Sequence, residues 1–323
     1  MKAWVLHGIE NFQLEDIKEP VLKDDEVLVA VQAAGICGSD IPRIYHAGAH
    51  CYPLIPGHEF SGIVIKTGMH IDASWNGRRV GVFPLIPCGG CPVCVQAKYE
   101  MCRHYSYLGS RRNGGFAEYV AVPADNLLLL PDNISYEEAA MLEPMAVVVH
   151  AMRRMMSKTD ERVLICGLGT IGMLLLLFLK EAGIQNVYVV GNKYVQKLAA
   201  VRAGLSEDRY CDSASENVKE WIMDRTGGVG VDVFYECVGK NETVSLAVDV
   251  AAPGGGICLL GNPHTNMILE KSVYWKILRN QLTITGTWNS SFLHKKEDDW
   301  HYAMEKVSQK RIMPTSLITH RIS

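Results

Sequence analysis

The sequence predicts an α/β protein of two domains, the second built on a doubly wound parallel sheet. Its 323 residues, 48% of them hydrophobic, can bury more core than one domain ordinarily holds. The second half places a glycine-rich turn between an apolar strand and a helix, and short apolar runs then alternate with helical stretches. The first half is marked instead by cysteine, histidine and glycine in short segments.

The composition excludes several classes of function. The formal net charge of −3 and the lack of a long lysine or arginine run argue against a nucleic-acid partner. The longest apolar run, residues 173–179, is far shorter than the roughly 20 residues of a membrane-spanning helix. The N-terminal residues also lack the apolar core of a secretory signal. We therefore expect a cytoplasmic protein with no membrane partner, in which reducing conditions disfavour disulfides.

Two regions of the first half predict bound metal, and the more compact is C-G-G-C-P-V-C-V-Q-A-K-Y-E-M-C at residues 88–102. Its cysteines have the spacing of a short loop that wraps its thiolates around one tetrahedral Zn²⁺: Cys88, Cys91, Cys94 and Cys102. Four sulfur ligands leave no open position, so we predict a structural zinc. A thioredoxin-like redox site would instead need a lone C-x-x-C pair.

The second metal region combines three separate segments. G-I-C-G-S-D contains Cys37, P-G-H-E-F-S-G contains His58 and Glu59, and E-P-M-A-V-V-V-H begins with Glu143. Taken alone, each segment is a weak signal, because an isolated cysteine or histidine is more often packed or solvated than bound to metal. Together they offer sulfur, nitrogen and oxygen ligands of the kind that a catalytic zinc accepts.

The glycine-rich turn opens the second half, in E-R-V-L-I-C-G-L-G-T-I-G-M. An apolar strand at 163–166 leads through the turn into a helix, the context that makes G-x-G-x-x-G a dinucleotide-binding signal. Gly167 makes the tight turn, Gly169 lets backbone approach a pyrophosphate and Gly172 allows close helix packing. Thr170 and Ile171 open the helix whose N-terminus faces the anion. The βαβ series continues in apolar runs at 186–190, 231–235, 256–260 and 282–284.

The choice of dinucleotide depends on the end of the second strand, where an acidic residue commonly binds the ribose of NAD. This sequence has Gly191 and Asn192 in that place, with Lys193 beside them. Lys193 could suit a 2′-phosphate, although a solvated surface lysine has the same sequence signature. We predict NAD as cofactor and leave NADP open.

These motifs, in this order, resemble the zinc-containing medium-chain dehydrogenase/reductase family over essentially the whole chain. Within the family, "G-I-C-G-S-D-I-P-R-I-Y-H-A-G-A-H-C-Y-P", "P-L-I-P-C-G-G-C-P-V-C" and "Y-L-G-S-R-R-N-G-G-F-A-E-Y" are most similar to polyol dehydrogenases. The resemblance implies a GroES-like β-rich catalytic domain over residues 1–150, with a structural zinc lobe at about 84–105. It further implies a Rossmann domain over 151–286 and a return to the catalytic domain over 287–323.

The activity that the resemblance implies is oxidation of a secondary hydroxyl of a sugar alcohol phosphate, of the galactitol 1-phosphate to tagatose 6-phosphate type. Zinc and a nicotinamide cofactor would both take part. The alternatives are dehydrogenases of unphosphorylated polyols such as sorbitol or xylitol, or of butanediol. A zinc-stabilised nucleotide sensor is disfavoured, because a sensor has no use for an open metal position.

The resemblance also implies roles for individual residues. The catalytic zinc would be bound by Cys37, His58 and Glu143. Glu59 would lie close by as an exchangeable ligand or supporting carboxylate, Ser39 would relay the proton and Asp40 would orient His58. Pro42 stands where many relatives carry a histidine that passes the proton to solvent.

A phosphorylated substrate would need cationic side chains, and three arginines in loop segments of the catalytic domain are candidates: Arg43, Arg111 and Arg112. Each could equally be a solvated or ion-paired surface arginine.

The remaining expectations concern assembly and the end of the chain. The patterns at 257–260 and 283–286 resemble the edge through which these enzymes pair, so we expect a homodimer or homotetramer, although a buried core strand has the same pattern. The chain ends at T-H-R-I-S, before the family's catalytic domain would be complete.

Overall fold

The chain folds into two compact units. The computed structural model describes residues 1–155, 158–263 and 265–322. Met1–Ala146 and Ser291–Thr315 form the first unit, and Val147–Ser290 with the residues from Ser316 onward form the second. The first boundary between the units therefore lies after Ala146, inside helix α4 (Leu142–Met155), whereas we expected it at residue 150. The chain passes back into the second unit after Thr315, whereas we expected all of residues 287–323 to belong to the catalytic domain.

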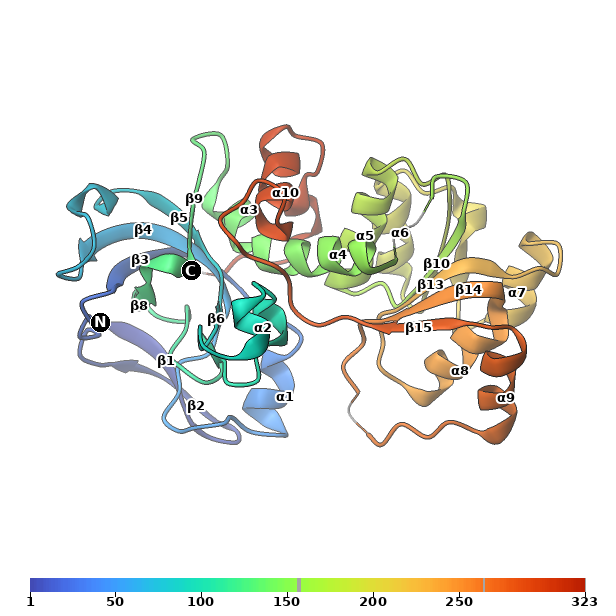
Figure 1. The fold of residues 1–323 in the computed structure, drawn as a ribbon, viewed down its shortest axis with the longest axis horizontal. Coiled ribbons are helices and arrows are strands. Elements are labelled where there is room, and N and C mark those ends of the chain that lie inside the picture. The colour runs from blue at the N-terminus through green and yellow to red at the C-terminus, as the bar shows by residue number, and fades with distance from the viewer. Residues whose placement is uncertain (156–157, 264, 323) are drawn as a thin grey trace. The chain divides into compact units, whose positions relative to one another are not determined.

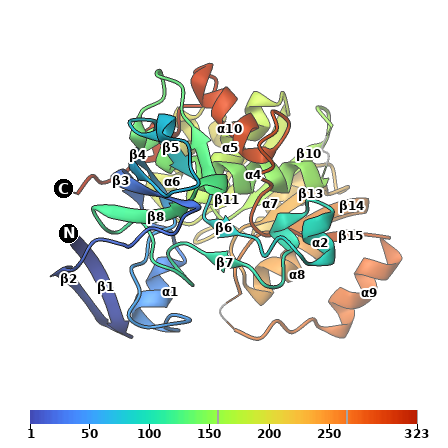
Figure 2. The same ribbon diagram turned by 60° about the vertical axis from the view of Figure 1, so that its left-hand side comes forward.

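The first unit is built on a five-stranded antiparallel sheet with the order β8-β3-β4-β5-β9. These strands are β3 (Glu26–Gly35), β4 (Glu59–Thr67), β5 (Arg79–Val82), β8 (Tyr119–Pro123) and β9 (Leu127–Leu129). Valines dominate its buried face, with Phe60 and Leu108 among them, because β-branched side chains pack well on a pleated surface. Figure 2 shows the separate hairpin of β1 (Lys2–Gly8) and β2 (Asn11–Asp16) below this sheet.

Short elements complete the first unit. They are α1 (Asp40–Tyr45), β6 (Leu85–Ile86), α2 (Pro92–Val95), β7 (Ser106–Tyr107), α3 (Tyr136–Ala140) and α10 (Asp299–Ser308), with 3₁₀ turns at Ala73–Trp75, Tyr99–Met101, Ala124–Asn126 and Pro314–Leu317. Helix α3 begins with a capping box, in which Glu138 N–H donates to Ser135 Oγ (3.2 Å) and Ser135 N–H donates to Glu138 Oε2 (2.8 Å). This exchange satisfies two backbone donors at the helix start.

The second unit contains a six-stranded parallel sheet with the order β12-β11-β10-β13-β14-β15. Its strands are β10 (Arg162–Cys166), β11 (Asn186–Gly191), β12 (Tyr210–Asp212), β13 (Val231–Glu236), β14 (Ala251–Leu259) and β15 (Thr283–Gly286). This order is that of a Rossmann fold, whose ligand crevice lies at the carboxyl ends of the strands where the order reverses. The predicted parallel sheet is confirmed, and β12 is the strand that the apolar runs did not indicate.

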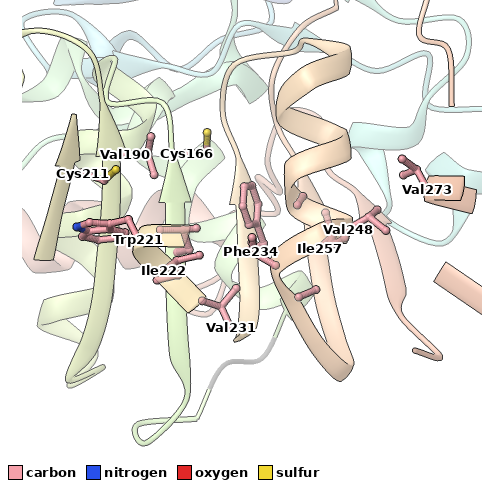
Figure 3. Packing of buried hydrophobic residues seen from close by; sticks show 14 residues of the cluster. Cys166, Val190, Cys211, Trp221, Ile222, Val231, Phe234, Val248, Ile257 and Val273 are labelled. Atoms are coloured by element: carbon pink, nitrogen blue, oxygen red, sulfur yellow. The ribbon is translucent and has the colours of Figure 1, made fainter. Parts of the chain in front are cut away.

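Helices cover both faces of this sheet. They are α5 (Thr170–Glu181), α6 (Tyr194–Arg202), α7 (Val218–Arg225), α8 (Asn241–Val250) and α9 (Lys271–Arg279), with a 3₁₀ turn at Glu207–Arg209. Figure 1 shows α5 and α6 on one side of the sheet and α8 and α9 on the other. In Figure 3, Trp221 and Ile222 of α7 and Val248 of α8 pack with Phe234 and Ile257 of the sheet. None of the helices in the described ranges is long and apolar enough to cross a membrane.

Candidate active site

Three of the predicted ligands come together at the adjoining ends of β3 and β4. Cys37 follows the end of β3, His58 precedes β4, and Glu59 is the first residue of β4. The strands are antiparallel and Gly35 is opposite Glu59, so this register brings the segments together. A Cβ on Gly35 would lie 2.5 Å from Glu59 Oε2, so glycine makes room for the carboxylate. The ligand atoms of Cys37, His58 and Glu59 all lie within 4.8 Å of one another.

The His58 ring has the burial and the protonation state of a metal ligand. Its Nδ1 is buried without a hydrogen-bond partner among the described residues and lies 3.7 Å from Asp40 Oδ1. Burial, with a smaller contribution from the positive charge of Arg43, lowers the pKa of His58 to about 3. The imidazole is therefore neutral at physiological pH, which is the form that binds metals.

Asp40 lies behind the histidine as the first residue of α1, fully buried. Its Oδ2 accepts from Cys37 N–H (3.0 Å), and its Oδ1 accepts from the Arg43 guanidinium. Burial raises the pKa of Asp40 to about 6, although Arg43 and the Cys37 N–H act in the opposite direction. Asp40 thus bonds the Cys37 backbone and lies close to His58, whose ring we expected it to orient.

Glu143 lies near this group but outside the set of mutually close ligand atoms. It belongs to the first turn of α4, and its Oε1 accepts from the Tyr107 hydroxyl at 3.1 Å. The Tyr107 ring also packs edge-on against His58, with ring centres 5.8 Å apart. The structure therefore groups Glu59 with Cys37 and His58, whereas the resemblance implied Glu143 as the third ligand. Tyr107 was not anticipated, because nothing in its local sequence marks it.

The electrostatics of the group favour a bound cation. Burial raises the pKa of both Glu59 and Glu143, and the negative charge of Glu143 raises the pKa of Glu59 further. Burial also raises the pKa of Cys37, and both carboxylates add to that rise. A divalent cation would supply the positive charge that stabilises these ionised groups together. The Ser39 hydroxyl donates to Cys37 Sγ at 3.4 Å, so it contacts the proposed ligand atom.

The four clustered cysteines form a second group in the same unit. Their Sγ–Sγ distances include 3.4 Å for Cys91–Cys94 and 3.9 Å for both Cys88–Cys94 and Cys91–Cys102. Zn–S bonds of about 2.3 Å arranged as a tetrahedron place sulfurs about 3.8 Å apart. All ten cysteines are free thiols. A hydrogen bond from the Cys94 backbone is the main cause of a pKa of about 6 for Cys91. The residues therefore fit a tetrahedral zinc.

The glycine-rich turn of the second unit has the geometry that its sequence predicts. Gly167 has a φ of +100°, a region that favours glycine. Gly169 precedes α5, and a Cβ there would meet nothing within 4 Å. A Cβ on Gly172 would lie 2.0 Å from the Gly167 carbonyl oxygen, so this helix packs too closely for any other residue. Thr170 and Ile171 form the first turn of α5. The loop leaves backbone accessible at the helix N-terminus, where anions bind.

The proposed determinants of cofactor choice follow β11. Asn192 and Lys193 are both exposed. Their backbone N–H groups donate to Gln196 Oε1, at 3.0 and 3.2 Å, and this fixes the turn into α6. Their side chains stand at the carboxyl end of a parallel strand, the side of such sheets on which ligands bind.

The three candidate arginines have different surroundings. Arg43 bonds Asp40, and Arg112 bonds the buried carboxylate of Glu26. Arg111 lies over the ring of Tyr105, with Cζ 4.6 Å from the ring centre.

Comparison with known proteins gives two family matches and a group of relatives. Residues 23–132 match the alcohol dehydrogenase GroES-like domain, and residues 170–309 match the zinc-binding dehydrogenase family. Galactitol 1-phosphate 5-dehydrogenase of Escherichia coli strain K12 is 33% identical over 95% of this chain and 88% of its own. D-arabitol-phosphate dehydrogenase of Enterococcus avium is 33% identical over 97% and 88%. Sorbitol dehydrogenase of Bacillus subtilis is 31% identical over 83% and 77%.

Solved structures agree with these matches. The crystal structure of galactitol-1-phosphate dehydrogenase from Escherichia coli has a TM-score of 0.90 and 32% identity, covering 97% of this chain and 90% of its own. A zinc-binding dehydrogenase from Sinorhizobium meliloti bound to NADP has a TM-score of 0.88 and 30% identity, covering 97% and 89%. An alcohol dehydrogenase from Escherichia coli complexed with NADH has a TM-score of 0.88 and 26% identity, covering 98% and 90%. The expected combination of a GroES-like and a Rossmann domain is confirmed.

Proposed function

This chain belongs to the zinc-containing medium-chain dehydrogenase/reductase family, as a polyol dehydrogenase, and from that premise we propose that its substrate is a sugar alcohol phosphate. The proposed reaction is oxidation of a secondary hydroxyl, of the galactitol 1-phosphate to tagatose 6-phosphate type. The observation that carries the proposed chemistry is the convergence of Cys37, His58 and Glu59 within 4.8 Å. Two relatives named for sugar alcohol phosphates support the proposed substrate.

A catalytic zinc ion would be held by Cys37, His58 and Glu59, with Glu143 as the neighbouring carboxylate that can exchange with Glu59. Zinc acts as a Lewis acid that makes the substrate hydroxyl acidic near neutral pH. The Ser39 hydroxyl lies 3.4 Å from Cys37 Sγ and would relay the proton of the substrate by passing its own proton on toward solvent. Tyr107 holds Glu143 in place through its hydroxyl.

The second unit would bind the nicotinamide cofactor, which accepts the hydride from the carbinol carbon. The open backbone at Gly169 and the N-terminus of α5 are suited to the pyrophosphate. Asn192 and Lys193 would lie beside the adenosine ribose and accept NAD or NADP. A second, structural zinc would be held by the four clustered cysteines of residues 88–102.

A second candidate function is oxidation of an unphosphorylated polyol or of butanediol. The observation that favours it is the similarity to sorbitol dehydrogenase of Bacillus subtilis. The metal chemistry would be identical, and only the groups that contact the far end of the substrate would differ.

A steady-state assay distinguishes the two functions. The purified, zinc-loaded protein is mixed with NAD⁺ or NADP⁺ and with galactitol 1-phosphate, galactitol, sorbitol or butanediol, and nicotinamide absorbance is followed. We expect turnover chiefly with the phosphorylated polyol. Turnover with the plain polyols alone would reject the phosphorylated substrate and favour the second function. Loss of activity on chelation, restored by zinc, checks the metal requirement.

We also propose a homodimer or homotetramer that pairs through β15. This strand has a neighbour in the sheet on one side only, and Ile284 in it is 41% exposed. The unpaired backbone groups of an edge strand are a ready template for pairing with another chain. Light scattering of the purified protein tests the oligomeric state.

A further inference from the structure

We propose that Arg111 and His50 form the subsite that binds the phosphate group of the substrate. This inference rests on the proposed sugar alcohol phosphate substrate and specifies which side chains recognise it. Both residues belong to the first unit, which also contains the proposed catalytic metal ligands.

Two of the candidate arginines, Arg43 and Arg112, are already paired with buried carboxylates. The guanidinium of Arg43 is bonded to the fully buried carboxylate of Asp40, and its own side chain is only 15% exposed. Arg112 is likewise bonded to Glu26, whose side chain is 2% exposed. Each guanidinium neutralises a buried carboxylate, which would be costly to leave unpaired, so neither is free to bind a ligand.

Arg111 differs because its charge is not neutralised. Within residues 1–155, 158–263 and 265–322, no carboxylate lies at ion-pair distance from it. Its guanidinium is exposed and lies flat over Tyr105. Stacking on an aromatic ring orients a guanidinium while leaving its N–H groups free, and the planar fork matches two oxygens of a phosphate.

A chain of aromatic contacts places Arg111 near the proposed metal centre. The Tyr105 ring beneath Arg111 packs edge-on against the Tyr107 ring, with centres 6.2 Å apart. Tyr107 in turn contacts His58 and bonds Glu143. The guanidinium therefore lies two aromatic rings from the proposed ligands. In galactitol 1-phosphate the phosphate is at the opposite end of the carbon chain from the reacting carbinol, so a cation at some distance from the metal is what this substrate needs.

His50 is the second proposed donor, because its loop contacts the loop of Arg111. The thiol of the following residue, Cys51, lies 3.9 Å from the Arg111 carbonyl oxygen, so the two loops are in contact. Burial and then the positive charges of Arg111 and Arg43 lower the pKa of His50. Arg43 is already paired with Asp40, so the positive field beside His50 comes from Arg111, in a protein whose formal net charge is −3. A phosphate dianion is the ligand that such a field favours.

Both loops are held in shape before any ligand binds. The N–H groups of Arg111 and Arg112 donate to the Tyr107 carbonyl at 2.9 and 3.1 Å, and Gly109 N–H donates to the Arg112 carbonyl at 2.7 Å. In the other loop, Ala49 N–H donates to the Tyr52 hydroxyl at 2.9 Å. Fixed loops reduce the entropy lost on binding, which favours recognition of a small anion.

The test compares the variants Arg111→Ala and His50→Ala with the wild type in the zinc-loaded enzyme. The control is Arg78→Ala, which removes the same charge from an exposed site in the same unit. For each protein, kcat and KM are measured with galactitol 1-phosphate and with galactitol. Zinc content and the midpoint of thermal unfolding verify that each variant is folded.

We expect Arg111→Ala to raise KM for galactitol 1-phosphate by roughly 10- to 100-fold, the usual effect of losing hydrogen bonds to a charged group. Turnover of galactitol should change by less than about threefold, because that substrate has no phosphate to lose. His50→Ala should give a smaller loss in the same direction, and Arg78→Ala should leave both substrates unaffected.

Three results would overturn the inference, and they have different consequences. If the wild type prefers the phosphorylated substrate and Arg111→Ala keeps that preference, the subsite is wrong and the proposed function stands. If Arg111→Ala impairs both substrates equally, Arg111 is structural. If the wild type turns over only plain polyols, the phosphorylated substrate is wrong and the subsite fails with it.

Discussion

Replacing Arg43 by alanine tests whether this arginine supports the metal centre or binds substrate. In the structure its guanidinium bonds Asp40, which also accepts from the Cys37 backbone and lies 3.7 Å from His58. We expect Arg43→Ala to lower protein stability and metal affinity, and to impair phosphorylated and plain substrates by the same factor.

The burial of the pair sets the magnitude. The Asp40 side chain is 0% exposed and that of Arg43 is 15% exposed, so removing the arginine leaves a buried carboxylate without its counter-charge. Breaking such a pair costs about 3–5 kcal/mol, and the surviving Cys37 N–H hydrogen bond favours the lower end, about 3 kcal/mol. For 323 residues, with an unfolding entropy of about 2.1 cal/mol/K per residue, that corresponds to a fall of roughly 4–5 °C in the unfolding midpoint. Loss of support behind a metal ligand typically costs about 10- to 100-fold in metal affinity.

The assay combines thermal unfolding, zinc titration and kcat/KM for galactitol 1-phosphate and galactitol. Arg78→Ala, at an exposed site, should change stability by less than about 0.5 kcal/mol. The double variant Asp40→Asn/Arg43→Ala should recover part of the lost stability, since no buried charge is left unpaired. An unchanged unfolding midpoint, or a loss confined to the phosphorylated substrate, would refute the reasoning.

Three further predictions address the rest of the molecule. Cys37→Ser should reduce turnover by orders of magnitude with an unchanged circular dichroism spectrum, because it removes a proposed zinc ligand; full activity would exclude that role. Cys91→Ser should remove one zinc equivalent per chain and destabilise the lobe, which metal analysis and limited proteolysis would detect. Asp298 caps α10; burial alone would raise its pKa, but hydrogen bonds from His301 and the Leu293 backbone lower it. Its native state therefore binds fewer protons than its unfolded state, so the stabilisation is present at pH 7 and is lost as pH falls through the lowered pKa. Asp298→Asn should cost about 1 kcal/mol at pH 7 in urea unfolding, with a difference from wild type that shrinks toward pH 3.

Features formed by neighbouring residues could be predicted from the sequence. The cysteines of residues 88–102 belong to one short loop, so their spacing alone restricts the geometry they can adopt, and the structure brings all four sulfurs together. The glycine-rich turn is equally local, because the φ of Gly167 and the close approach at Gly172 arise within a few residues. The strand β12 escaped prediction because three residues carry too little apolar pattern to distinguish a strand from a loop.

Tertiary structure decided which side chains meet across the fold. The register of β3 and β4 places Glu59 rather than Glu143 beside Cys37 and His58. The spacing of residues along the sequence does not predict that register. The contact of Tyr107 with Glu143 likewise joins a strand to a helix that are distant in the chain. The three arginines have the same charge and similar loop contexts in the sequence. Only packing shows that Arg43 and Arg112 neutralise buried carboxylates while Arg111 does not, because desolvation of a charge depends on what surrounds it in space.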